Sequence, residues 1–244
     1  TGINNLGSIV FDASNTEYFN IGNFSSLTAG EIFSVLEANQ DTPGSPSDTG
    51  FIGFGTSGAN THYSWTDGNI YDAFGSNARY NIGNPSVPLS SANIYNVTSI
   101  AGNWTARFNG NQQFTSGGNT VSFTSTAIIG NSLTTAYSYS GQMSEIVLFN
   151  TALTDQSRAL INQYQSAKWG IGLDPLAGGG TEAAEAMDST NGFGVFTTRY
   201  LERLSATADI VLQANTSITL DLQGDILNLA DNRNISLITT NGNI

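Results

Sequence analysis

The residues best suited to chemistry in this 244-residue chain are aromatic, amide and carboxylate side chains gathered between residues 60 and 72. Aromatic rings stack on the faces of sugar rings, while amides and carboxylates hydrogen-bond the sugar hydroxyls. The candidate ligand contacts are Asn60, His62, Trp65, Asp67, Asn69 and Tyr71. The alternative is that Trp65 and Tyr71 pack against each other across neighbouring strands and belong to the core.

Catalytic carboxylates and nucleophiles are a second kind of chemistry to test. Retaining glycoside hydrolysis needs two carboxyl groups about 5–5.5 Å apart, a spacing that alternate residues on one strand provide. Glu145 stands alone between Ser144 and Ile146, so we interpret it as an outward-facing or hydrogen-bonded structural residue. His62 is the only histidine, and the Gly-x-Ser-x-Gly motif of a serine nucleophile is absent from the sequence. We therefore expect a protein that is not an enzyme.

Composition narrows the class of partner. The chain has 7 basic and 19 acidic residues, a net charge of −12. This charge repels phosphate backbones and anionic lipids, so we expect neither nucleic-acid binding nor membrane insertion. The absence of cysteine from the sequence excludes disulfides, zinc–thiolate sites and thiol nucleophiles. Few lysines among many Asn, Ser, Thr and Gly residues indicate an exported, secreted or bacterial-surface protein.

Short strands must position the candidate site. Compact apolar runs separated by turn residues recur along the chain, as is typical of an antiparallel sandwich. The predicted strands are 8–11, 32–36, 51–54, 62–65, 70–74, 94–100, 104–108, 111–114, 121–123, 127–129 and 143–149. Two tight hairpins are predicted by Asp67-Gly68 and Asn109-Gly110, because such pairs adopt the left-handed conformations of type I′ turns. The first of these hairpins carries the candidate ligand contacts.

Residues 154–170 have apolar residues at helical rather than strand spacing, which predicts one helix after the last strand. Thr154 and Asp155 are suited to its start, and Lys168 and Gly170 are suited to its end. The apolar residues that recur at helical spacing between these ends are Leu160, Ile161, Tyr164 and Ala167.

The C-terminal part of the sequence is a repeat. Isoleucines recur at positions 210, 218, 226, 235 and 244. Equal spacing of this kind is typical of stacked strands, so we expect the start of a β-helix with the first four isoleucines pointing inward. A small antiparallel meander is the alternative. The repeat stops in the middle of a unit at Ile244, so we expect the natural protein to continue.

Two parts of the sequence resemble known families. Residues 8–15 and 18–22 resemble the opening of bacterial laminin-G-like, concanavalin-A-type modules, and residues 139–150 resemble their last strand. The resemblance covers about residues 7–172. Residues from 208 onward are similar to the filamentous-haemagglutinin-like β-helices of secreted adhesins.

The resemblance implies a domain organisation and a core. It places an antiparallel jelly-roll sandwich with one C-terminal helix at 1–172 and a β-helix-like segment at 191–244. Between them, Asp174-Pro175 and Gly178-Gly179-Gly180 predict a linker at 173–190. The resemblance also assigns Trp104 and Trp169 to the core. Within the predicted linker, a short helix is expected at 181–187.

The resemblance also implies an adhesive function. It predicts a carbohydrate- or ligand-binding module of a large secreted surface protein, whose partners are a glycan or another cell-surface ligand and neighbouring domains of the same fibre. The alternative is a structural spacer or assembly subunit without a sugar site. Some such modules bind calcium, but here the matching stretch 60–63 holds no carboxylate and the loop after Gly130 begins Asn131-Ser132. We therefore expect no metal or other cofactor there, although Asp41 and Asp48 lie in a loop that could bind calcium.

Overall fold

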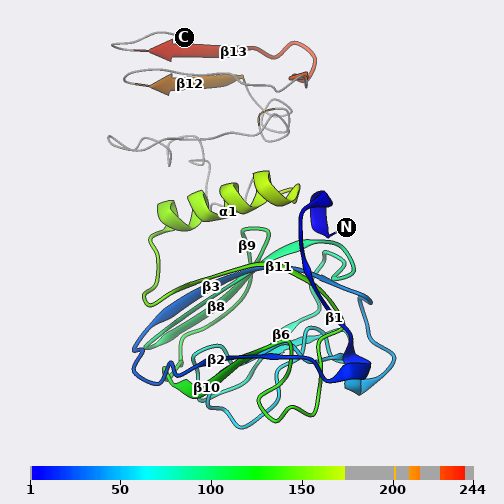
Figure 1. The fold of residues 1–244 in the computed structure, drawn as a ribbon. Coiled ribbons are helices and arrows are strands. Elements are labelled where there is room, and N and C mark those ends of the chain that lie inside the picture. Colours follow the sequence, from blue (N-terminus) through cyan, green and yellow to red (C-terminus); the bar gives the residue numbers. More distant parts are fainter. Residues whose placement is uncertain (1, 174–200, 202–208, 215–225, 240–244) are drawn as a thin grey trace.

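The computed structural model of the protein describes residues 2–173, 201, 209–214 and 226–239. Two antiparallel sheets face each other across a core, and one helix lies on the outer side of the larger sheet (Figure 1). The six-stranded sheet has the order β1 (Ile9–Phe11), β11 (Gly141–Phe149), β3 (Gly30–Ala38), β7 (Asn93–Ile100), β8 (Asn103–Phe108) and β9 (Asn111–Ser116). The three-stranded sheet has the order β2 (Phe19–Gly22), β10 (Phe123–Ile129) and β4 (Ile52–Gly55). The predicted antiparallel sandwich with one helix is confirmed.

The central strand β3 is buried on both faces. Ile32 and Leu36 point into the core between the sheets, whereas Phe33 and Val35 point to the outer side and pack with the helix-end residue Trp169. Alternate residues of a strand face opposite sides, so this strand supplies two separate apolar clusters. Its sequence consequently has apolar residues on both faces between Ile32 and Leu36, with Ser34 as the one polar residue among them.

The outer cluster is covered by helix α1 (Asp155–Trp169) (Figure 1). The side chain of Thr154 accepts a hydrogen bond from the Ser157 amide over 3.1 Å, and Gly170 ends the helix with φ at 66°. Both ends agree with the predicted helix. Trp104 and Trp169 are 0% and 4% exposed, which confirms their assignment to the core.

The buried face of α1 differs from the one that the apolar residues indicate. Leu160 and Tyr164 are 40% and 48% exposed, and Ala167 is also exposed. The buried positions are Arg158, Asn162, Gln165 and Trp169. The helix is oriented by polar and aromatic contacts with the sheet, which apolar periodicity does not reveal.

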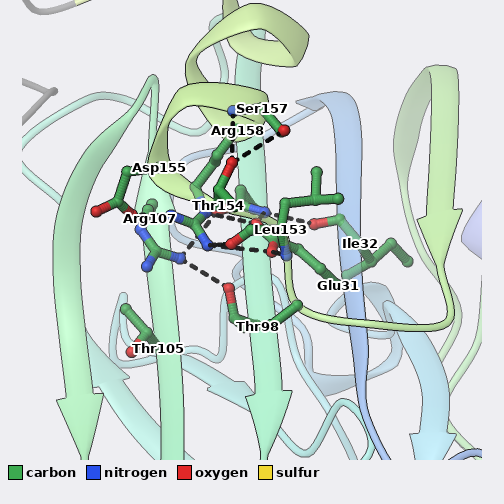
Figure 2. A network of polar contacts seen from close by, with 12 residues as sticks. Glu31, Ile32, Thr98, Thr105, Arg107, Leu153, Thr154, Asp155, Ser157 and Arg158 are labelled. Atoms are coloured by element: carbon green, nitrogen blue, oxygen red, sulfur yellow. Dashed lines mark hydrogen bonds and ion pairs between the residues drawn. The ribbon is translucent and has the colours of Figure 1, made fainter. Parts of the chain in front are cut away.

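The most extensive of these polar contacts surrounds Glu31 of β3. Arg158 donates to its carboxylate through Nε over 2.6 Å and through Nη2 over 3.2 Å. Asn96 Nδ2 and the Leu153 amide donate over 2.9 and 2.8 Å. Arg107 of β8 donates to Asn96 of β7. It also donates to Thr98 of the same strand (Figure 2). This network fixes the start of the helix on the outer face of the sheet.

The predicted strands differ from the observed ones in four places. Strand β2 (Phe19–Gly22) has no counterpart among the predicted strands. One strand, β10, which begins at Phe123 and ends at Ile129, replaces the two strands predicted at 121–123 and 127–129, and Val121 forms only an isolated bridge with Ser76. Residues 62–65 form only an isolated bridge, from His62 to Tyr71, because Tyr63 and Ser64 turn inward and are fully buried. The neighbouring strand β5 (Ile70–Asp72) pairs instead with β6 (Tyr80–Gly83), which was not predicted. The Asn109-Gly110 hairpin is confirmed, with φ at 48° and 87°.

The described part of the C-terminal repeat is one parallel pair. Strand β12 (Ile210–Ala214) pairs in register with β13 (Ile235–Thr239), so that Ile210 lies opposite Ile235. Ile210 is 5% exposed, whereas Ile226 is 68% exposed and belongs to no strand. The inward orientation predicted for Ile226 is therefore wrong. Ile218, Ile244, the linker beyond Leu173 and the helix expected at 181–187 lie outside the described residues, and a β-helix is not shown.

Candidate ligand-binding site

A tight turn positions the predicted ligand contacts. The amide of Gly68 donates to the carbonyl of Trp65 over 2.9 Å, and the amide of Trp65 donates to the carbonyl of Asn69 over 2.8 Å. Gly68 has φ at +80°, a conformation that glycine adopts without steric cost. His62 and Tyr71 exchange two backbone hydrogen bonds of 2.8 and 3.0 Å. The turn and this bridge bring residues 62–71 together at one surface.

Four rings gather at this hairpin, and we call His62, Trp65, Tyr71 and Tyr137 the hairpin aromatic group. The His62 ring lies 4.4 Å from Trp65, 5.1 Å from Tyr137 and 6.1 Å from Tyr71, measured between centroids. Trp65 and Tyr137 meet edge to face at 5.7 Å. Tyr137 was not predicted, because it comes from the loop after β10, far from the hairpin in sequence.

His62 forms the floor of this group. It is 4% exposed, and its Nδ1 lies 2.9 Å from Thr49 Oγ1. Burial, and secondarily the charge of Arg79, lowers the pKa of His62 to about 4, so the ring is neutral at pH 7. Trp65, Tyr71 and Tyr137 are half-buried above it. His62 thus supports the rings, and the half-exposed rings present the contact surface.

The polar side chains at the rim are largely engaged with one another. Asp67 accepts hydrogen bonds from the Asn69 amide over 2.8 Å, from Asn69 Nδ2 over 3.0 Å and from the Tyr71 hydroxyl over 2.9 Å. Partial burial opposes ionisation of this carboxyl, but these hydrogen bonds lower the pKa of Asp67 below its ordinary value. An ionised Asp67 therefore fixes the orientation of Asn69 and Tyr71.

Arg79 closes the other side of the site. Its guanidinium carbon lies 4.8 Å from the centroid of the Tyr71 ring, and its Nη1 donates to the Asn60 carbonyl over 2.9 Å. The Asn60 side-chain oxygen in turn accepts from Thr134 Oγ1 over 2.5 Å. All six predicted contacts therefore lie in one region, with Arg79, Thr134 and Tyr137 added by the structure.

The other residues considered for chemistry have structural partners. Glu145 accepts hydrogen bonds from Tyr164 over 2.8 Å, from Lys168 over 3.1 Å and from Trp169 over 2.6 Å, so its interpretation as a hydrogen-bonded structural residue is confirmed. Asp41 accepts from the Leu89 amide over 2.6 Å, and Asp48 accepts from Ser47. Among the described residues, no three His, Asp or Glu side chains come together as metal ligands would.

The fold and the site define a two-sheet antiparallel β-sandwich that carries half-exposed aromatic rings on a surface hairpin. No protein-family model and no curated protein sequence matches the chain. Within its described part, no helix is long and apolar enough to cross a membrane.

Solved structures with a similar backbone include the following three proteins or domains. A SAP-like pentraxin of Limulus polyphemus shares 16% identity at a TM-score of 0.47, covering 68% of this chain and 84% of the pentraxin. The CBM40 domain of the Ruminococcus gnavus IT-sialidase, bound to sialyllactose, shares 12% sequence identity at a TM-score of 0.45. The match covers 64% of this chain and 97% of the CBM40 domain. Domain 4 of the Geobacillus stearothermophilus arabinanase AbnA, in complex with arabinotriose, shares 12% sequence identity at a TM-score of 0.43. The match covers 63% of this chain and 75% of that domain.

Proposed function

We propose that the sandwich is a non-enzymatic carbohydrate-binding module and that the hairpin aromatic group is its site. The observation that carries the proposal is the half-buried pair Trp65 and Tyr71, held over the buried His62 ring. Apolar ring faces rimmed by oriented amide, carboxylate and guanidinium groups are the arrangement that binds a sugar ring and its hydroxyls.

The charge of the chain favours a neutral or weakly charged saccharide. The net charge of −12 repels sulfated and sialylated glycans. Arg79, the cation of the site, is already placed over Tyr71 and hydrogen-bonded to Asn60. Recognition therefore depends on ring stacking and a few hydrogen bonds, and we expect weak binding by one copy and stronger binding by several linked copies.

The setting that we propose is an adhesive, laminin-G-like module of a secreted or surface-displayed bacterial protein. Its support is the sequence resemblance of residues 7–172 and the composition of the chain, which is poor in lysine and lacks cysteine. In this setting the module binds a glycan of a cell surface and adjoins other domains of a fibre.

A structural spacer without a sugar site is the second candidate. The specific observation in its favour is that Asp67, Asn69 and the Tyr71 hydroxyl satisfy one another within the hairpin, so fewer polar groups remain for a ligand.

A glycan array with the intact protein, run with and without Ca²⁺, distinguishes the two candidates. The saccharide identified in this way is then titrated into the parent protein and into Trp65→Ala and Tyr71→Ala. Removal of one stacking ring should weaken binding about tenfold. Tyr18→Ala, which removes a half-exposed ring from another part of the surface, is the matched control and should bind as the parent does. If no saccharide binds, the spacer replaces the carbohydrate-binding module.

A further inference from the structure

A second surface of the sandwich exposes side chains that folded proteins usually bury. Ile9 and Val10 of β1 are 51% and 65% exposed, and Tyr18, Phe19 and Ile21 at β2 are 46%, 47% and 37% exposed. We call these five residues the β1–β2 surface. Four of them line a hollow of about 490 Å³ together with Phe11 and the polar residues 15–17. Singly exposed apolar residues are ordinary, but a contiguous group indicates a contact surface.

The same surface lies at the edges of both sheets. Within the described part of the chain, β1 pairs only with β11, and β2 pairs only with β10. A short helical turn, Ala13–Asn15, follows β1 and precedes β2. An edge strand presents a row of backbone N–H and C=O groups without strand partners, and proteins usually protect such an edge with lysine, proline or a covering segment. The sequence of β2, Phe-Asn-Ile-Gly, contains neither lysine nor proline.

The charged residues of the segment that forms this surface, residues 9–21, are both acidic. Asp12 and Glu17 are exposed beside it, and the first basic residue of the sequence is Arg79. Glu17, which lines the hollow, accepts a hydrogen bond from the backbone amide of Asp12 over 3.1 Å. The Asp12 carboxylate accepts hydrogen bonds from the amide and hydroxyl of Ser14 over 2.9 and 2.7 Å. An acidic rim favours a basic partner and opposes a second copy of this acidic chain.

We propose that the β1–β2 surface binds an extended polypeptide segment of another protein, one that alternates apolar and basic residues and adds to β2 as a further strand. The backbone of the segment pairs with the free edge of β2. Its apolar side chains cover Phe19 and Ile21, and its Lys or Arg side chains face Asp12 and Glu17. Strand addition of this kind combines backbone hydrogen bonds with side-chain pockets at alternate positions. The proposal does not depend on the carbohydrate-binding site.

Calorimetric titration of the full chain with synthetic peptides tests this proposal. The probe is a short blocked peptide of alternating Lys and Val residues, and the controls are the same peptide with Glu in place of Lys and a version N-methylated at alternate residues. The Lys–Val peptide should bind, and each control peptide should bind at least about tenfold more weakly. Amide hydrogen exchange of β2 should slow when the Lys–Val peptide is bound.

Variants of the protein locate the binding. Val10→Thr and Ile21→Thr keep a β-branched side chain on exposed positions, so they should fold as the parent does and bind the peptide about tenfold more weakly when combined. Leu160→Gln, a similar change of an exposed residue on α1, should leave peptide binding unchanged. Trp65→Ala should also leave it unchanged, which separates this proposal from the carbohydrate-binding one.

Four results would overturn the proposal. The first is equal binding of the Lys–Val and Glu–Val peptides. The second is full peptide binding by the combined Val10→Thr and Ile21→Thr variant. The third is concentration-dependent dimerisation in sedimentation that this variant abolishes, because the occupant would then be a second copy. The fourth is displacement of the peptide by the array-identified saccharide, because the surface would then belong to the sugar site.

Discussion

Arg158 of helix α1 donates a hydrogen bond over 2.6 Å to Glu31 of strand β3, 127 positions earlier in the chain. The two side chains are 9% and 0% exposed, and Figure 2 shows how Leu153 and the neighbouring strands surround them. A buried charge is stable only when it is paired and hydrogen-bonded. This pair therefore couples the helix to the sandwich.

Removal of one partner should be costly. Arg158→Met leaves the Glu31 carboxylate buried without its counter-ion, and we expect the free energy of unfolding to fall by about 3–5 kcal/mol. Urea denaturation measures this change. Glu31→Gln combined with Arg158→Met should recover part of the loss, because the buried charge is then absent. Lys168→Met, which breaks the more exposed pair with Glu145, is the control and should cost much less; equal losses would contradict the role assigned to burial.

Asp72 gives the protein an unusual dependence on pH. Burial raises the pKa of this carboxyl to about 6, although hydrogen bonds from Tyr95, Ala73 and Phe74 act in the opposite direction. Between about pH 4 and 6 the folded state then holds a proton that the unfolded state has released, so this group's contribution to stability falls as pH rises. The pKa of His62 is lowered to about 4, so in this pH range the unfolded state holds a proton that the folded state has released. The contribution of His62 to stability therefore rises as pH rises.

The variant Asp72→Asn lacks the titrating carboxyl, so a comparison of its stability with that of the parent measures the contribution of Asp72 alone. We expect the free energy of unfolding of the parent, relative to this variant, to fall by roughly 2 kcal/mol as pH rises from 4 to 6.5 and to change little above pH 6.5. Urea denaturation at several pH values measures the difference. A difference that does not change with pH would show that Asp72 titrates normally in the folded protein.

The N-terminal residues belong to the folded unit. Ile3 is 5% exposed and packs in the outer cluster with Trp169 and Ile171. We predict that the fragment 2–173 unfolds cooperatively by itself and that the fragment 7–172 is less stable by about 1.5–3 kcal/mol, the contribution of one buried isoleucine. Thermal and urea denaturation of both fragments check this prediction. A fragment 2–173 that aggregates or lacks a transition would show that the C-terminal residues complete the core.

Local signals predicted much of the fold. Thr154 and Gly170 set the ends of the helix through hydrogen bonding and backbone conformation within a few residues. The two helix ends could therefore be predicted from the sequence alone. The buried face of the same helix depends on Arg158 reaching Glu31 from a distant strand, and apolar spacing carries no information about that contact. Val10 and Phe19 are as hydrophobic as core residues, yet they lie exposed on edge strands. Which strands become edges depends on the pairing of the whole sheet.

Only the part of the candidate site that is local in sequence could be predicted. Trp65, Asp67 and Tyr71 lie within one hairpin whose turn residues are recognisable in the sequence. Tyr137 and Arg79 reach the hairpin from other parts of the chain. His62, predicted as a ligand contact, lies beneath Trp65 because Thr49 and the surrounding rings bury it. Burial of this kind follows from the packing of two loops and has no local signature.

Tryptophan fluorescence tests the central claim most directly. Trp65 is half-buried, whereas the other two tryptophans, Trp104 and Trp169, are 0% and 4% exposed, so a change in emission or in acrylamide quenching on ligand addition reports on the hairpin. The array-identified saccharide is titrated into the parent and into Trp65→Phe, with calorimetry in parallel. Saturable protection of Trp65 in the parent, absent in Trp65→Phe, is the predicted result. Calorimetric binding that leaves the fluorescence of the parent unchanged would place the saccharide elsewhere and contradict the assignment of the hairpin aromatic group as the site.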